Sequence, residues 1–124
     1  MADSPAAGFD GLRLRHWRPH RREDGVLVLQ FDRADAPVNA FSQDVLIELA
    51  DVLERIAIDP PKGVVIASAK ASGFIAGADL KEFQEFDRKG TVDDAIRRGQ
   101  DVFQRLAELP CPTVAAIHGF CMGG

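Results

Sequence analysis

The chain has 124 residues, of which 46% are hydrophobic and 27% are charged, and its formal net charge is −4. This composition is typical of one globular domain with its own core. It excludes extensive disorder, and it lacks the basic excess of a protein that binds nucleic acid or an anionic membrane. Cys111 and Cys121 form no pattern of a disulfide framework or a zinc site, so we expect a reduced protein in the cytoplasm.

The first residues carry no targeting or membrane signal. No apolar run approaches the length of a membrane span, and residues 1–11 lack the charged start and apolar stretch of a signal peptide. We therefore expect residues 1–11 to be a flexible lead and residues 12–124 to belong to a folded domain. The arginines between residues 13 and 22 are more typical of a solvated strand edge than of a basic binding surface.

The chain opens with the pattern of a β-hairpin. Apolar and polar residues alternate over residues 12–17, which predicts a half-exposed strand that Pro19 ends. A turn at residues 23–25 leads into Val26–Phe31, an apolar run that predicts a more buried second strand. Residues 32–39 then form a loop.

Two long amphipathic helices are predicted. Ser42 is a good N-cap for the first, and the second follows Gly90, with Thr91 and Asp94 in an approximate capping box. The apolar stripe of the first helix is Val45, Leu46, Leu49, Val52, Leu53 and Ile56, and that of the second is Ala95, Ile96, Val102, Phe103, Leu106 and Leu109. Their charged residues indicate solvated faces.

Two further apolar runs, Gly63–Ser68 and Thr113–Ile117, predict strands that are buried on both faces. Between them, Asp79 is placed to cap a short helix. The alternation of strands and helices predicts a layered α/β fold.

Each of these last two strands is followed by a turn of small residues. Residues 76–78 follow the first of them, and Gly123 and Gly124 follow the second, where a helix would begin. Small side chains leave backbone N–H groups accessible to a ligand. If the N–H groups of Ala78 and Gly124 converge on a carbonyl oxygen, they form an oxyanion hole in which each donor contributes about 3 kcal/mol to transition-state stabilisation. A simple glycine turn is the alternative.

The sequence offers few other candidates for catalytic residues. The chain has no nucleophile motif, dinucleotide-binding motif or P-loop. Glu82 and Glu85 are candidate acids or bases, although carboxylates on a short exposed helix are more often solvated surface. His118 has no partner for a dyad or a metal site and is more typical of a structural histidine.

At these turns the sequence resembles a known family. Phe74–Lys81 together with Pro112–Gly124 is similar to the paired signature of the crotonase, or enoyl-CoA hydratase/isomerase, superfamily, and Val38–Ser42 is similar to its Asn-Ala turn. The resemblance extends over residues 12–124, and in detail it is to the hydratase domain of multifunctional fatty-acid oxidation α-subunits. It implies a crotonase-like ββα-superhelix fold of the α/β class, truncated after the fourth strand.

The resemblance also implies a site. The N–H groups of Ala78 and Gly124 would form the oxyanion hole for an acyl-CoA thioester, and Lys81 would be the candidate contact to a CoA phosphate. The substrate-binding residues would be Ala40, Ala76, Gly77, Asp79, Leu80 and Lys81. The family commonly has a basic residue just before the Asn-Ala turn, where this chain has Ala36 and Pro37. This departure counts against a contact to the CoA phosphate.

The implied reaction is hydration of a trans-2-enoyl-CoA in fatty-acid β-oxidation, with no metal and no cofactor of its own. NAD would enter only through a dehydrogenase domain of the parent protein, which would be oligomeric, with a thiolase subunit as a candidate partner. The catalytic glutamates of the family's hydratases come after the glycine run, so we expect the chain alone not to hydrate its substrate.

Other interpretations stay open. Within the fold, the chemistry could be double-bond isomerisation, decarboxylation or dehalogenation of an acyl-CoA. From other classes, the chain could be a non-catalytic CoA-binding or assembly module, or a truncated gene product. A nucleotide-binding α/β domain is disfavoured, because neither glycine turn follows the first strand.

Overall fold

The computed structural model describes residues 8–123 and contains a mixed sheet, a small second sheet and three helices. In chain order the elements are β1 (Trp17–Arg21), β2 (Val26–Phe31), α1 (Gln43–Ile58), β3 (Gly63–Ser68), β4 (Gly73–Ile75), α2 (Leu80–Lys89), α3 (Val92–Ala107), β5 (Thr113–Ala116) and β6 (Phe120–Cys121). The predicted α/β class is confirmed.

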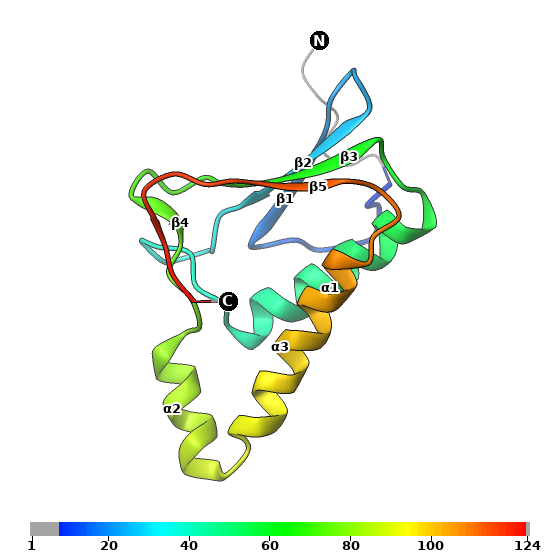
Figure 1. Cartoon of the computed structure of the whole chain (residues 1–124). Helices are drawn as coiled ribbons and strands as arrows, with labels where there is room; N and C mark the ends of the chain where they lie inside the picture. The colour runs from blue at the N-terminus through cyan, green and yellow to red at the C-terminus, as the bar shows by residue number, and fades with distance from the viewer. Residues whose placement is uncertain (1–7, 124) are drawn as a thin grey trace.

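The larger sheet has the strand order β1-β2-β3-β5, in which β1 is antiparallel to β2 and the other pairs are parallel. Parallel neighbours need long crossovers, and α1 provides one between β2 and β3. α1 and α3 run side by side against one face of this sheet, and α2 extends away from it (Figure 1). β4 and β6 form a separate parallel pair.

The core lies between α1 and the central strands. The whole predicted stripe of α1 is buried, and it packs against Leu27, Leu29 and Phe31, which are fully buried on one face of β2. Trp17 stacks on Phe31 with ring centroids 4.2 Å apart. Ser42 caps α1 as predicted, because its hydroxyl accepts a hydrogen bond from the Val45 N–H at 3.3 Å.

The first strand differs from its prediction. It begins at Trp17, where the predicted strand ends, and it contains Pro19. Proline is tolerated there because β1 is the outer strand of the sheet and needs hydrogen bonds on one side only. The alternation over residues 12–16 therefore reflects packing on α1 and not strand pairing.

The position of residues 15–17 is fixed by Glu48 on α1. Its buried carboxylate accepts hydrogen bonds from the backbone N–H groups of Arg15, His16 and Trp17 at 2.7, 2.8 and 2.7 Å. A carboxylate is an acceptor for several donors at once, so it satisfies backbone groups that no strand partner reaches. The segment entering β1 is thereby fixed to the middle of α1.

The other end of the sheet also differs from its prediction. Every residue of β5 is exposed, and Val114 retains 59% of its accessible surface. One face of β5 borders an open cavity that Ala115 shares with Phe103 and Leu106 of α3, and no helix among residues 8–123 covers the other face. The sequence also missed the short strands β4 and β6. The strand counted as fourth from the sequence is therefore β5.

The structure also differs from expectation in the N-terminal lead and at the start of α3. Within the expected flexible lead, residues 1–7 lie outside the described residues, whereas Phe9 is buried to 4% exposure beneath the Arg21 guanidinium. Thr91 precedes α3 as expected but makes no capping hydrogen bond with its side chain. Its hydroxyl instead donates to the Phe86 carbonyl oxygen at 3.4 Å.

Replacing Glu48 with glutamine should destabilise the fold. The amide nitrogen of a glutamine cannot accept a hydrogen bond, so at least one of the buried donors at residues 15–17 loses its partner, at a cost of about 2 kcal/mol in the free energy of unfolding. Urea unfolding followed by Trp17 fluorescence measures this change. Glu54→Gln on the exposed side of the same helix is the matched control. Equal effects of the two substitutions would contradict the role of Glu48.

Candidate functional site

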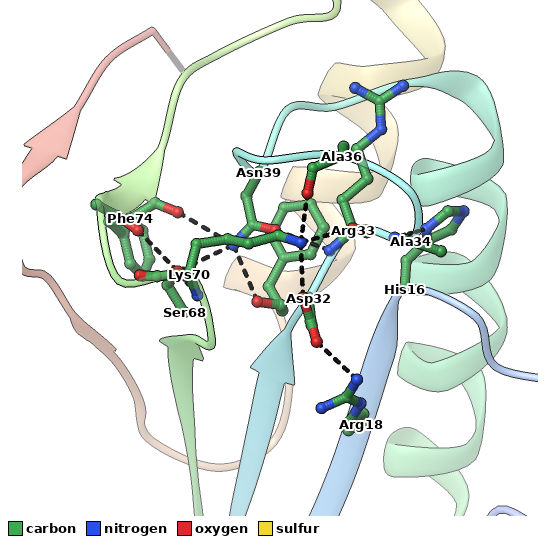
Figure 2. A network of polar contacts seen from close by, with 12 residues as sticks. His16, Arg18, Asp32, Arg33, Ala34, Ala36, Asn39, Ser68, Lys70 and Phe74 are labelled. Atoms are coloured by element: carbon green, nitrogen blue, oxygen red, sulfur yellow. Dashed lines mark hydrogen bonds and ion pairs between the residues drawn. The ribbon is translucent and has the colours of Figure 1, made fainter.

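The site is built around the side-chain amide of Asn39, which is fully buried in the loop after β2. Its Nδ2 donates to the carbonyl oxygens of Phe31 and Phe74 at 2.9 and 3.3 Å and to the Ser68 hydroxyl at 3.0 Å. Its Oδ1 accepts the Arg33 N–H at 2.9 Å. One side chain thus joins the ends of β2, β3 and β4 (Figure 2).

The backbone beside Asn39 then pairs with the loop at residues 76–79. The Ala76 N–H donates to the Asn39 carbonyl oxygen at 2.8 Å, and the N–H and C=O of Phe41 bond to the Gly77 carbonyl and the Asp79 N–H at 2.8 and 2.9 Å. Successive peptide groups in an extended segment point in opposite directions. The Ala78 N–H is therefore directed away from Phe41 and is available to a ligand.

The two glycine turns meet, as the oxyanion-hole hypothesis requires. Gly77 has a φ of +91° and Gly123 a φ of +78°. A Cβ added to Gly77 would lie 3.2 Å from the Met122 carbonyl oxygen, and one added to Gly123 would lie 3.1 Å from the Gly77 Cα. The close backbone approach and the positive φ angles disfavour a side chain at either position. Gly124, the second predicted donor, lies outside the described residues.

Asp79 closes the loop as the N-cap of α2, which confirms its predicted structural role. Its Oδ1 accepts the Glu82 N–H at 3.1 Å, and its Oδ2 is 2.5 Å from Nη2 of Arg33. Burial by itself raises the pKa of Asp79, but the Glu82 N–H and the Arg33 guanidinium outweigh that effect and hold the pKa below its usual value. Asp79 is therefore an anion with a fixed orientation.

Glu82 is not the solvated surface residue that was expected. Its Oε1 accepts the Gln43 N–H at 2.6 Å and so occupies the N-terminus of α1. Burial raises the pKa of Glu82, and the carboxylates of Asp79 and Asp44 add to the rise, against the opposing effect of the Gln43 N–H. Glu85, in contrast, pairs with Arg88 on the surface of α2, as expected.

A cavity of about 230 Å³ opens where these elements meet. Gly77, Ala78 and Asp79 form one side of it, and residues of α1, α2 and α3 form the rest. The lining is mostly apolar, and its hydrocarbon residues are Phe41, Leu46, Phe83, Phe86, Ala95, Ile96 and Phe103. Gly99 on α3 also lines the cavity and has no side chain to fill it, although a Cβ at this position would make only an ordinary contact with Leu46, at 3.7 Å.

The structure brings most of the predicted site residues together. Ala40 is buried in the turn between Asn39 and Phe41, directly beside Ala76–Ala78. Leu80 is 74% exposed at the start of α2, and Lys81 next to it is also exposed. His118 lies away from the cavity, where its Nε2 is 3.0 Å from the Lys70 carbonyl oxygen. This contact fits the structural role expected for His118.

Sequence analysis did not predict the polar contacts of Lys70 and Asp32, which hold the loop after β2. Lys70 reaches from the end of β3 to the carbonyl oxygens of Arg33 and Ala36 at 2.8 and 2.7 Å and to the Asp32 carboxylate at 2.7 Å (Figure 2). Hydrogen bonding and charge from Lys70 lower the pKa of Asp32. No motif marks these positions, because their partners are mostly backbone oxygens.

The family model described as enoyl-CoA hydratase/isomerase matches residues 21–124. This match extends over most of the chain and contains every element of the site. The chain belongs to the enoyl-CoA hydratase/isomerase, or crotonase, family, and its fold is crotonase-like.

Named relatives agree with this assignment. The chain is 36% identical over 105 residues to the fatty acid oxidation complex subunit alpha of Shewanella halifaxensis, a match that covers 84% of this chain and 15% of that protein. Among solved structures, an enoyl-CoA hydratase of Mycobacterium smegmatis has a TM-score of 0.74 and 32% identity, with 83% of this chain and 40% of that chain covered. One from Bacillus anthracis has a TM-score of 0.75 and 27% identity, with 84% and 40% covered. The chain thus spans a minor part of each relative's length.

The contact between the two glycine turns can be tested with a matched pair of alanine substitutions. Gly77 and Gly90 both have a left-handed φ, of +91° and +72°, but a Cβ at Gly90 meets no atom within 4 Å. Gly90→Ala should cost about 1 kcal/mol from backbone strain alone. Gly77→Ala adds the clash with Met122 and should cost about 2 kcal/mol or more.

Urea unfolding followed by Trp17 fluorescence compares the two variants. An equal loss of stability in both would mean that the turns at Gly77 and Gly123 do not touch in solution.

Proposed function

We propose that this chain supplies the carbonyl-activating half of an enoyl-CoA hydratase site that acts in fatty-acid β-oxidation. The observation that carries the proposal is the Ala78 N–H, which is left without a strand partner on the wall of an apolar cavity, beside the contact between Gly77 and Gly123. The N–H groups of Ala78 and Gly124 are the two proposed donors of the oxyanion hole.

In this proposal, the two donors bind the thioester oxygen of a trans-2-enoyl-CoA. Water adds to the β-carbon, a proton adds to the α-carbon, and the thioester oxygen carries negative charge in between. Donors that are fixed before the reaction stabilise that charge without reorganisation. The hydrogen bonds of Phe41 to the peptide groups on both sides of Ala78 support such a fixed orientation.

The cavity supports an acyl substrate. Its walls are mostly hydrocarbon, which favours an aliphatic chain over a polar ligand. The acyl chain would enter between α1 and α3, with the thioester at Ala78. The CoA portion would lie along Ala40, Ala76, Gly77, Asp79, Leu80 and Lys81. Lys81 is exposed in the first turn of α2, in keeping with a phosphate contact.

The proton-transfer groups are proposed to lie outside the described residues. Asp79 and Glu82 are the carboxylates of residues 8–123 that line the cavity, and both are committed to helix N-termini. A general acid or base must reach the reacting carbon or the attacking water. The chain alone is therefore proposed not to hydrate its substrate.

The same proposal extends to the parent protein. The parent protein is proposed to be oligomeric and cytoplasmic, with a thiolase subunit as partner and with NAD used by a separate dehydrogenase domain. The relative named a fatty acid oxidation complex subunit alpha supports a protein that works in a multi-subunit complex. Among residues 8–123, no helix is long and apolar enough to cross a membrane.

Binding of a dienoyl-CoA thioester tests the proposal directly. Hydrogen bonds to the thioester oxygen draw electron density along the conjugated chain, so the absorption band of the bound dienoyl group should move to longer wavelength. The 124-residue chain should produce this shift, yet it should show no hydration of crotonyl-CoA. CoA without an acyl group is the control ligand and should bind more weakly, because it leaves the apolar cavity empty.

Two results would contradict the proposal. Binding of the thioester without a red shift would contradict the proposed oxyanion hole. Measurable hydration by the chain alone would show that the chain itself contains the catalytic acid and base.

A further inference from the structure

We propose that Arg33 is a positioning residue for the Ala78 donor and that it also neutralises the Asp79 carboxylate beside that donor. The inference rests on the proposed function, because it gives Arg33 a part in the same oxyanion hole. Nη2 of Arg33 and Oδ2 of Asp79 are 2.5 Å apart, one residue beyond Ala78 in the chain. Ala78 and Asp79 line the same cavity.

The positioning role follows from the hydrogen bonds around Ala78. Phe41 holds the Gly77 carbonyl and the Asp79 N–H, which fixes the backbone on both sides of the donor. The Asp79 side chain adds a second restraint, because each of its oxygens has its own partner, the Glu82 N–H and Arg33. Rotation of this carboxylate would break both contacts and free the start of α2.

Arg33 can act as a restraint because its own backbone is fixed. Its N–H donates to Oδ1 of Asn39 at 2.9 Å, and its carbonyl oxygen accepts a hydrogen bond from Nζ of Lys70 at 2.8 Å. Figure 2 shows both contacts converging on the segment that leaves β2. Arg33 therefore connects Asn39, which its backbone N–H contacts, to Asp79, the cap of α2, which its guanidinium contacts.

The charge of Arg33 has a separate consequence. The proposed reaction places negative charge on the thioester oxygen at Ala78, next to an Asp79 carboxylate whose side chain is 17% exposed. Two negative charges at close range repel strongly where water is scarce. Arg33 offsets the charge of Asp79, so the oxygen gains electron density without this repulsion.

The charge effect and the packing effect can be separated at Asp79. Asparagine keeps a side-chain oxygen that can cap α2, but it carries no charge. If Arg33 acts by offsetting the carboxylate, then Arg33→Met should impair the site, and adding Asp79→Asn to it should restore the part of the loss that comes from the unpaired charge. If Arg33 only fills space, the second substitution should restore nothing.

The test uses the 124-residue chain and the red shift of a bound dienoyl-CoA. Arg33→Met should lose at least half of the shift and bind the thioester about tenfold more weakly. Arg33→Lys, which keeps the charge, should retain more of the shift than Arg33→Met. The double variant Arg33→Met/Asp79→Asn leaves no unpaired buried charge, so it should fold and recover part of the shift. Its shift should stay below the wild-type value, because the contact that positions Asp79 is still missing.

Arg22→Met is the matched control, because it removes an exposed Arg–Asp pair in the turn between β1 and β2. It should leave both the shift and the affinity unchanged. A full shift in Arg33→Met, or no recovery in the folded double variant, would overturn the inference. Absence of the shift in the wild-type chain would instead contradict the proposed function, so the two failures are distinguishable.

Discussion

The structure depends on how the buried amide of Asn39 is satisfied. Each of its polar atoms has a partner, and these partners come from the ends of β2, β3 and β4. A buried amide without partners costs roughly 1–3 kcal/mol per missing hydrogen bond, so the three strand ends can separate only at a considerable loss of stability. Asn39 thereby fixes the place where the loop at residues 76–79 must pair with Phe41, and that pairing directs the Ala78 N–H away from Phe41.

This arrangement explains why the site consists of backbone and small residues. The Ala78 N–H shares its peptide group with the Gly77 carbonyl, and both this carbonyl and the following Asp79 N–H are hydrogen-bonded to Phe41. The close contact between Gly77 and Gly123 disfavours side chains at these two positions. Asp79 and Glu82 then occupy the N-termini of α2 and α1, so their charges stabilise the helices that form the cavity. In this account the carboxylates of Asp79 and Glu82 hold the helices around the cavity, and backbone N–H groups stabilise the charge that develops in the proposed reaction.

The sequence predicted the parts of the molecule that rest on local patterns. The stripe and cap of α1, the boundaries of β2 and the capping role of Asp79 are all as expected, because each depends on residues a few positions apart. The family resemblance is confirmed by the matching family model. What could not be predicted depends on distant partners: Glu48 beneath residues 15–17, Lys70 beneath the loop after β2, and Arg33 on Asp79. Side-chain bonds to distant backbone atoms leave no periodic signal, and the exposure of β5 depends on which other elements pack on its two faces.

The central claim is that the Ala78 N–H binds the oxygen of an acyl thioester. NMR measures this most directly through the amide proton of Ala78 in the isotope-labelled chain, titrated with butyryl-CoA and, separately, with CoA alone. The account predicts that butyryl-CoA moves the Ala78 amide resonance downfield, as a new hydrogen bond does, and that CoA without the thioester leaves it nearly unchanged. An unchanged Ala78 resonance in the presence of bound butyryl-CoA, or an equal change with CoA alone, would contradict the claim.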